Sequence, residues 1–366
     1  MPDSIPGTTA ISSLEDAHGG LSYCGYRLQD WIAHGSYEQV AYLLLHGELP
    51  DRRALRAFRR RVAAARELSP ALRRAVGRIP ASTSPMAALR TGVSLLGNFE
   101  PPRMARDESA RALVRRAERL LGAAPALLAQ WYRGRAPRAP AAAGMAAYLL
   151  AAFGRPSSSP EAVQALDRSL MLYAEHVINA STLTARVIAS TGADLYAAMG
   201  GALGALSGPL HGGANEAALT LLQRLGSPAQ AVAHIAARLA RGERIPGFGH
   251  RLYRNGDPRS AAHRRLARQM AEHATTPLAA RRLVRAAEAV EQFMLEQRGL
   301  HSNVDWYAAA LYRTLGIPAA LCTPLFACAR LAGWAAHVQE QRARGRLVQN
   351  PSHYDGPAPR PWPSHG

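Results

Sequence analysis

The sequence contains no lysine and little cysteine. All 44 residues counted as Lys+Arg are arginine, and the 26 acidic residues leave a formal net charge of +18. The 3 cysteines, Cys24, Cys322 and Cys328, are too few and too scattered for a disulfide framework or a zinc site, which favours a reducing compartment. The basic excess indicates an anionic partner, either nucleic acid, an acidic surface or a phosphorylated small molecule. Codon bias in a GC-rich genome is the alternative explanation for the arginine.

Targeting segments and long apolar runs are also missing. The N-terminal MPDSIPGTTA has neither a basic start nor an apolar centre, so it does not resemble a signal peptide. The longest uncharged apolar stretch, residues 139–154, has 16 residues, which is short of the roughly 20 needed to cross a bilayer. We therefore expect a soluble, cytoplasmic protein that does not insert into a membrane.

Several common functional motifs are absent. The sequence has no GxxxxGK[ST] phosphate loop, no GxGxxG dinucleotide fingerprint and no HExxH zinc motif, so nucleotide hydrolysis, hydride transfer and zinc hydrolysis have no support. Strand signals are scarce as well. Only residues 8–13 and 21–26, which flank the turn-like residues 16–20, predict a short β-hairpin.

Helix signals dominate the rest of the chain. A capping serine followed by a proline suited to the first helical turn occurs at Ser69-Pro70, Ser84-Pro85, Ser159-Pro160 and Ser227-Pro228. Ser36 and Gln39 have the spacing of a capping box that opens a helix over residues 37–46, closed by Gly47. The arginines of residues 52–78 alternate with apolar residues at helical spacing, which is typical of a solvated helix face. We predict a mainly α-helical fold, and 366 residues suggest about two domains.

Polar residues that core-forming helices do not need gather in residues 173–182, 208–216 and 247–259. A lone histidine is more often a core or capping residue than a functional one. Beside His211 and His250, however, glycines allow close approach of the backbone to a ligand and leave amides free at a helix start, where anions bind. Asp305 lies beside two aromatic residues at another helix start. It either caps that helix or, if the aromatics desolvate it, has a raised pKa suited to a general base.

Together with residues 323–334, these segments resemble the citrate synthases, and most closely the compact bacterial branch that contains the 2-methylcitrate synthases. The resemblance runs from about Thr8 to Pro357. It implies a mainly α-helical homodimer with a large and a small domain and a short N-terminal β-hairpin. The large domain would comprise residues 1–212 and 317–356, the small domain residues 213–316, and residues 357–366 would form a flexible proline-rich tail.

The resemblance implies an acyltransferase that condenses an acyl-CoA with oxaloacetate and then hydrolyses the thioester, with no metal or redox cofactor. Asp305 would remove a proton from the carbon next to the thioester, His211 would donate a hydrogen bond to the thioester oxygen, and His250 would polarise the ketone. The implied ligands of the oxaloacetate carboxylates are His176, Arg259, Arg330 and, by position, Gln349. The implied contacts to coenzyme A are Arg254, Gly247 and Gly249.

Four positions depart from the family pattern. Gln349 stands where the family usually has an arginine that reaches the partner subunit's site, and Arg344 and Arg346 are nearby candidates to replace it. The loss of such a charged hydrogen bond costs about 1.5–3 kcal/mol if nothing replaces it. The other departures are Cys24, Ser84 and Ala87. They leave open a diverged relative with a changed acyl-CoA or keto-acid substrate, or a non-catalytic protein that binds CoA or metabolites. The net charge leaves nucleic-acid binding as a further alternative, which we do not expect.

Overall fold

The structure is a computed structural model that describes residues 7–14, 20–101, 107, 109–137, 143–154, 159–253, 255–349, 356 and 358. Its elements are β1 (Ser12–Ser13), β2 (Ser22–Tyr23), β3 (Tyr26–Arg27), α1 (Leu28–His34), α2 (Tyr37–His46), α3 (Arg52–Ala64), α4 (Pro70–Gly77), α5 (Pro85–Asn98), α7 (Ala110–Arg133), α8 (Met145–Phe153), α9 (Pro160–Ala174), α10 (Ala180–Ser190), α11 (Leu195–Leu206), α12 (Gly213–Arg224), α13 (Pro228–Ala240), α14 (Pro258–Glu272), α15 (Leu278–Arg298), α16 (Val304–Thr314), the 3₁₀ turn η2 (Ala319–Leu321) and α17 (Cys322–Arg344). The predicted mainly α-helical fold is confirmed. The predicted tail lies outside the described residues, apart from Ala358.

The predicted β-hairpin is present near the N-terminus in a shorter form. Ser12 of β1 pairs with Tyr23 of β2 in antiparallel register, and Tyr23 pairs in turn with Tyr26 of β3. Each strand is 2 residues long. β3 is an addition to the predicted hairpin, because so short a strand has too few alternating side chains to be recognised in a sequence. Of the predicted turn between β1 and β2, only Gly20 is described.

Four helices begin at the predicted Ser-Pro pairs. In α4, α5, α9 and α13 the serine hydroxyl accepts a hydrogen bond from the backbone N–H three residues on, at 3.2–3.4 Å. Ser227 also forms a full capping box with Gln230. The capping box predicted at Ser36 is wrong. Its hydroxyl donates to the side-chain oxygen of Gln39 at 2.9 Å instead of serving the backbone, although α2 begins and ends where predicted.

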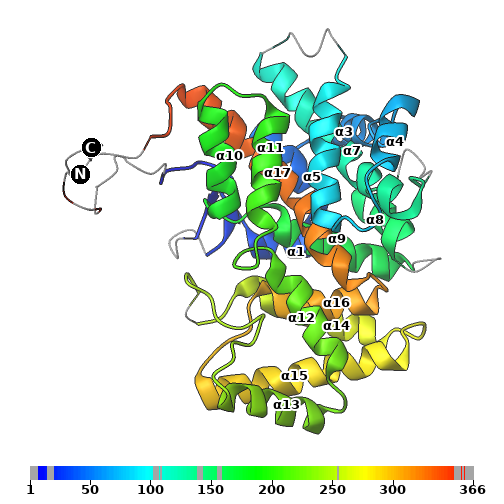
Figure 1. The fold of residues 1–366 in the computed structure, drawn as a ribbon, viewed down its shortest axis with the longest axis vertical. Helices are drawn as coiled ribbons and strands as arrows, with labels where there is room; N and C mark the ends of the chain where they lie inside the picture. Colours follow the sequence, from blue (N-terminus) through cyan, green and yellow to red (C-terminus); the bar gives the residue numbers. More distant parts are fainter. Residues whose placement is uncertain are drawn as a thin grey trace, which may run out of the picture.

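α17 is the central helix of the protein (Figure 1). It contacts α2, α5, α7, α9, α10, α11 and α12. By length and composition, residues 319–344 are apolar enough to cross a membrane, but 89% of the most apolar window is buried inside the protein. An apolar surface on every side is the pattern of a helix that is surrounded by others. α17 is therefore a core helix.

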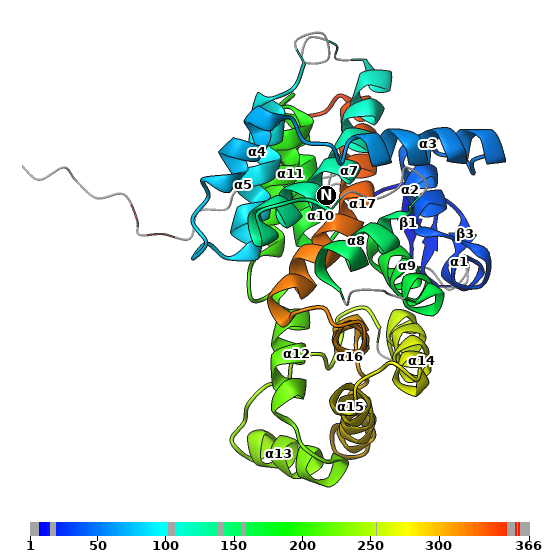
Figure 2. The ribbon, with the colours of Figure 1, turned by 90° about the vertical axis from the view of Figure 1, so that its right-hand side faces the viewer.

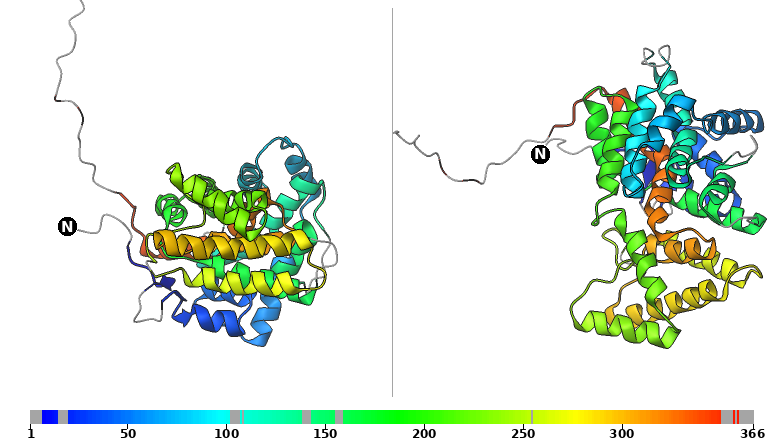
Figure 3. Two further views of the ribbon diagram at one scale, coloured as in Figure 1. Left: turned by 90° about the horizontal axis from the view of Figure 1, so that it is seen from below. Right: turned by 45° about the vertical axis from the view of Figure 1, so that its right-hand side comes forward.

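The helices form two groups. α12 to α16 pack against one another at one end of the molecule, and the other helices pack around α17 at the opposite end (Figures 1 and 2). Seen from below, α14 and α15 run side by side across the smaller group (Figure 3). The chain enters this group through α12 and leaves it after α16, so the smaller group is inserted between α11 and α17. The domain limits at residues 212 and 317 stay a prediction.

Candidate active site

The three residues predicted to perform the chemistry all contact the segment around the end of α9 and the start of α10. His211 lies between α11 and α12, His250 between α13 and α14, and Asp305 in the first turn of α16. Asp305 is hydrogen-bonded to α9, His211 to α10, and the His250 ring lies against the connecting loop. The structure therefore brings side chains from three distant parts of the sequence to one place between the two groups of helices.

Asp305 is a partly buried carboxylate that a tyrosine holds in place. Tyr173 of α9 donates its hydroxyl to Asp305 Oδ1 at 3.1 Å, and Asn215 of α12 donates to the same hydroxyl at 2.7 Å. Burial raises the pKa of Asp305 to about 6, against the lowering effects of Arg259 and of the tyrosine hydrogen bond. Of the two alternatives that the sequence left open, the raised pKa agrees with this burial, and the cap of α16 is Asn303, whose side chain accepts the backbone N–H of Asp305. Such a carboxylate is ionised at neutral pH and is a stronger base than an ordinary aspartate.

The aromatic residue beside Asp305 differs from the two expected from the sequence. Trp306 donates its indole N–H to a backbone oxygen of α15 at 3.0 Å, and Tyr307 donates its hydroxyl to a glutamate of α15 at 2.6 Å. Both side chains therefore anchor α16 on α15. The aromatic residue in hydrogen-bond contact with Asp305 is Tyr173, 132 residues earlier in the chain. This pairing has no signal in the local sequence.

His211 is a neutral imidazole at the start of α12. Burial and the charge of Arg330 lower its pKa to about 4. Its Nε2 lies 2.9 Å from Ser181 Oγ, which in turn lies 2.8 Å from the Oδ1 atom of Asn179. The single hydroxyl proton of Ser181 points either to Asn179 or to His211. In the first case the proton of His211 is on Nε2, and in the second it is on Nδ1.

His250 has a tautomer fixed by the backbone. Its Nδ1 accepts hydrogen bonds from the N–H groups of Leu252 and Tyr253 at 3.1 and 3.3 Å. Nδ1 is therefore unprotonated, and in the neutral ring the proton is on Nε2. Burial and the charge of Arg259 lower the pKa of His250, which favours this neutral form.

His176 lies in the loop between α9 and α10 and is 6% exposed. Its ring centroid is 5.5 Å from that of His250, and its Nε2 lies 3.0 Å from the hydroxyl of Tyr253. Burial, together with the charges of Arg259 and Arg330, holds the pKa of His176 well below its ordinary value. His176 and His250 are therefore two neutral rings in contact.

Arg259, in the first turn of α14, is clamped by Asp257. Its Nε lies 3.0 Å from Asp257 Oδ1 and its Nη2 lies 2.8 Å from Oδ2. Burial lowers the pKa of Arg259, but the Asp257 carboxylate more than offsets this, so the net shift is upward. Asp257 Oδ2 also accepts the backbone N–H of Val304 at 3.1 Å. One carboxylate therefore fixes both Arg259 and the start of the helix that bears Asp305.

Arg330 of α17 is a buried cation with an unused donor. The side chain is 1% exposed, and its Nε donates to the backbone oxygen of Tyr173 at 2.6 Å. Its Nη1 has no hydrogen-bond partner among the described residues. A buried charged nitrogen without a partner is costly unless a ligand supplies one. Arg330 thus has the properties of an anion ligand.

The two glycines predicted at the coenzyme A site shape the loop that precedes His250. Gly247, at a φ of 88°, accepts the backbone N–H of Asn303 at 2.9 Å, and a Cβ there would lie 2.9 Å from the ring of Trp306. Gly249, at a φ of 76°, accepts the Asn303 side-chain amide at 3.0 Å. Both glycines therefore lock this loop to the start of α16. The third predicted coenzyme A ligand, Arg254, lies outside the described residues.

A basic hollow lies apart from these residues. It has a volume of about 900 Å³ and is bounded by α3, α4 and the end of α7; its arginines are Arg60, Arg66, Arg73, Arg74 and Arg135. It shares no residue with the active-site cluster, which consists of His176, His211, His250, Arg259, Asp305 and Arg330. Most of them are exposed, which confirms the solvated face predicted for residues 52–78. No group of three or more His, Cys, Asp or Glu side chains suited to a metal ion occurs in the part of the chain that the structure describes.

The family model described as "Citrate synthase, C-terminal domain" matches residues 3–350. The chain belongs to the citrate synthase family. It is 40% identical to the 2-methylcitrate synthase of Shewanella oneidensis, over 97% of this chain and 93% of that protein. It is 36% identical to citrate synthase 2 of Bacillus subtilis, over 96% and 93%. Its fold is similar to that of the citrate synthase of Thermoplasma acidophilum, solved in a ternary complex with carboxymethyl coenzyme A and oxaloacetate, with a TM-score of 0.88, 28% identity and coverage of 99% of this chain and 97% of that one.

In this citrate synthase family member, the predicted oxaloacetate ligand Gln349 does not lie with the other site residues of the same chain. Gln349 is exposed, and the residue before it donates its backbone N–H to Ser190 Oγ at 3.0 Å. Ser190 ends α10, whereas Ser181, which contacts His211, lies in its first turn. The 11 residues of α10 place its two ends ~16 Å apart. Arg344, a predicted substitute for the missing arginine, is paired with Glu340 at 3.4 Å.

The other departures have local structural roles. Ser84 caps α5 by accepting the backbone N–H of Ala87 at 3.3 Å. Cys24, at a φ of 46°, lies in the turn between β2 and β3, and its Sγ lies 3.7 Å from the backbone oxygen of Ile11.

Several contacts of the site could not be assigned from the sequence. The residues that make them are Tyr173, Ser181, Asn215, Tyr253 and Asp257. All five fall within the polar segments that the sequence singles out, so their neighbourhood carries a signal. Their partners lie up to 132 residues away, and only the folded chain reveals them.

Proposed function

We propose that this member of the citrate synthase family condenses an acyl-CoA thioester with oxaloacetate and hydrolyses the product thioester, as a citrate synthase or a 2-methylcitrate synthase. The observation that carries the proposal is the juxtaposition of a carboxylate of raised pKa, Asp305, with the neutral imidazoles His211 and His250. Two buried arginines supply the positive charge that a dianionic keto acid requires.

Asp305 takes the proton from the carbon next to the thioester. That carbon is a very weak acid, so the enolate oxygen must be stabilised as it forms. His211 is the donor to this oxygen. Its Nε2 faces Ser181, so its proton must be on Nδ1, and Ser181 must then direct its own proton to His211 instead of Asn179. Ser181 therefore selects the tautomer of His211.

His250 activates the second substrate. Because its Nδ1 accepts two backbone N–H groups, its Nε2–H is the donor that polarises the ketone of oxaloacetate. The enolate carbon attacks the ketone carbon and a new C–C bond forms. The Nε2–H of His250 stabilises the negative charge that develops on the ketone oxygen by a hydrogen bond, and the proton that Asp305 removed balances this alkoxide. Water then cleaves the thioester, which releases the free thiol of coenzyme A.

The carboxylates of oxaloacetate bind to Arg330, Arg259 and His176. Arg330 offers the Nη1 atom that has no partner in the protein. Arg259 has its Nε and Nη2 on Asp257, which leaves Nη1 for the substrate. Guanidinium groups suit this task because their fixed donors match carboxylate geometry. Arg254 and the backbone at Gly247 and Gly249 bind coenzyme A. Coenzyme A enters as part of the thioester substrate, and the reaction requires no metal or redox cofactor.

The active form is a homodimer in the cytoplasm. The homodimer is supported by the position of Gln349 near the end of α10 that is distant from His211, which suits a contact with the site of a second copy. The excess of arginine is mostly exposed helix surface, and neither nucleic acid nor a membrane is a partner. No observation on the described residues favours a non-catalytic protein.

A panel of acyl-CoA substrates tests the proposal. The purified protein is incubated with acetyl-, propionyl- or butyryl-CoA, with and without oxaloacetate, while free thiol is measured and the product is identified by its mass. We expect thiol release that depends on oxaloacetate, with at least one of the acyl groups. The absence of thiol release with every acyl-CoA, in protein that still binds oxaloacetate, would contradict the proposal and favour the non-catalytic alternative.

A further inference from the structure

The loop that bears His176 has a strained backbone that its own sequence does not explain. Val177 has a φ of 44°, in the left-handed region. A β-branched residue is a genuine outlier there, so surrounding contacts must impose this conformation. Because Val177 follows His176 directly, its conformation sets the course of the chain from His176 to the start of α10.

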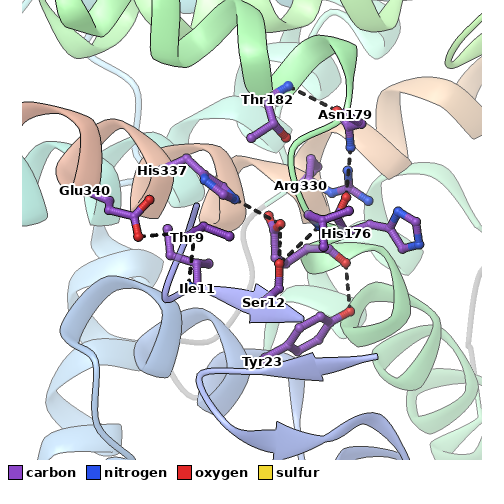
Figure 4. A network of polar contacts seen from close by, with 12 residues as sticks. Thr9, Ile11, Ser12, Tyr23, His176, Asn179, Thr182, Arg330, His337 and Glu340 are labelled. Atoms are coloured by element: carbon purple, nitrogen blue, oxygen red, sulfur yellow. Dashed lines mark hydrogen bonds and ion pairs between the residues drawn. The ribbon is translucent and has the colours of Figure 1, made fainter. Parts of the chain in front are cut away.

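Two residues of the N-terminal sheet hold this loop (Figure 4). Ser12 of β1 accepts the backbone N–H of Val177 at 3.1 Å and donates its hydroxyl to Glu175 Oε1 at 3.0 Å. Tyr23 of β2 donates its hydroxyl to the backbone oxygens of Glu175 and Met171, at 3.0 and 3.1 Å. The sheet therefore binds the residues on both sides of His176.

Glu175 is fixed from the opposite side by α17. Its Oε1 lies 3.0 Å from Nε2 of His337, and the Nδ1 of that ring accepts from Arg186 at 2.9 Å. Arginine only donates, so the proton of the neutral His337 ring is on Nε2 and points to Glu175. A Cβ at Gly333 would lie 2.2 Å from Glu175 Oε2, so the helix backbone leaves room for this carboxylate alone.

The same carboxylate lies near the buried charge of Arg330. Burial would raise the pKa of Glu175, but His337, Arg330 and the Ser12 hydroxyl together hold it below its ordinary value. Glu175 is thus an ionised, fully buried group that balances Arg330 while Nη1 of the arginine stays free.

We propose that Ser12 and Tyr23 are positioning residues for oxaloacetate: the N-terminal sheet holds Glu175 and Val177 in the one backbone form that directs His176 toward Tyr253 and His250. Neither residue touches the substrate in this account. The inference rests on the proposed role of His176 in binding oxaloacetate.

The variants Tyr23→Phe and Ser12→Ala test this inference. Each removes a hydroxyl and no other group, and phenylalanine fits the space of Tyr23. Tyr26→Phe is the matched control, because Tyr26 lies on the next strand and is 42% exposed. Ser69→Ala is the second control, because it removes the helix cap of α4 and lowers stability without touching the loop.

Each variant is characterised by calorimetric binding of oxaloacetate, the KM for oxaloacetate and for acyl-CoA, and the thermal midpoint. We expect Tyr23→Phe and Ser12→Ala to raise the Kd and KM for oxaloacetate about five- to tenfold, since each variant loses the hydrogen bonds of one hydroxyl to the loop. The KM for acyl-CoA should stay within about twofold, and both controls should keep the wild-type affinity. A general loss of stability would not raise the KM for oxaloacetate while leaving the KM for acyl-CoA unchanged.

Unchanged oxaloacetate affinity in both variants would overturn the inference and leave the proposed function intact. An equal weakening in Ser69→Ala would also overturn it, because the effect would then follow stability alone. Wild-type protein that binds no oxaloacetate would overturn the proposed function and this inference with it.

Discussion

Replacing Tyr173 with phenylalanine removes a hydroxyl that donates to Asp305 at 3.1 Å and leaves the rest of the buried ring in place. That hydrogen bond favours the ionised carboxylate, so its loss raises a pKa that burial has already brought to about 6. Asn215 also loses the acceptor of its amide, at 2.7 Å in the intact site. The variant therefore destabilises the ionised form of Asp305 and leaves the Asp305 side chain itself unchanged.

The size of the effect follows from the hydrogen bond. A hydrogen bond to a charged group contributes about 1.5 kcal/mol at the lower end of its range, which corresponds to about one pKa unit. With a pKa near 7 instead of 6, the ionised fraction of Asp305 at pH 6 falls from about one half to about one tenth. At pH 8 it stays near nine tenths. The variant should therefore lose about fivefold in kcat/KM at pH 6 and almost nothing at pH 8.

The assay is the initial rate of thiol release at low acyl-CoA and saturating oxaloacetate, measured from pH 5 to 9. Wild-type activity should fall on the acid side with an apparent pKa near 6, because a protonated Asp305 cannot accept a proton. Tyr173→Phe should move that limb to higher pH. Tyr196→Phe is the control, because its hydroxyl binds Glu100 at 2.9 Å, outside the cluster. An acid limb at the same pH in Tyr173→Phe and wild type would refute the reasoning.

Three further predictions follow from the site. Asp305→Asn should be inactive yet about 2–3 kcal/mol more stable than the wild type at pH 8, because the pKa of Asp305 is about 6 in the folded protein and 3.8 in an ordinary aspartate, so the ionised carboxylate destabilises the fold. The stability difference is complete above pH 6 and disappears below pH 3.8. Equal stability of the two proteins in urea at pH 8 would contradict this prediction. Gly333→Ala should lose about 1–3 kcal/mol, because its Cβ would meet Glu175, whereas Gly77→Ala, with open space, should lose none in the same denaturation assay. Gln349→Arg should lower the KM for oxaloacetate about tenfold in a homodimer, and an unchanged KM would place residue 349 away from the partner's site.

Much of the fold follows from local sequence signals. A serine that caps and a proline that fits the first turn act within four residues, so the starts of α4, α5, α9 and α13 can be read directly. Ser36 shows the limit of such reading. Its hydroxyl has a choice between the backbone and the Gln39 side chain, and both arrangements fit the same spacing. The two-residue strands lie below the length at which alternation is recognisable.

For the active site too, one part could be predicted from the sequence and another part could not. The resemblance to the citrate synthases assigned roles to Asp305, His211 and His250 because whole segments match, and the cluster that they form follows the fold of the family. The contacts that set their chemistry are long-range: Tyr173 lies 132 residues from Asp305, and Ser181 lies 30 residues from His211. Pairings of this kind depend on how α9, α10, α12 and α16 pack, which no local pattern encodes.

The most direct test of the account is the comparison of wild type with Asp305→Asn at pH 8 in the thiol-release assay, with oxaloacetate affinity measured on both proteins by calorimetry. The account predicts oxaloacetate-dependent thiol release by the wild type and a rate of thiol release about 10²–10⁴-fold lower in the variant. Both proteins should bind oxaloacetate with similar affinity. Turnover by Asp305→Asn at a rate near that of the wild type would contradict the assignment of Asp305 as the base.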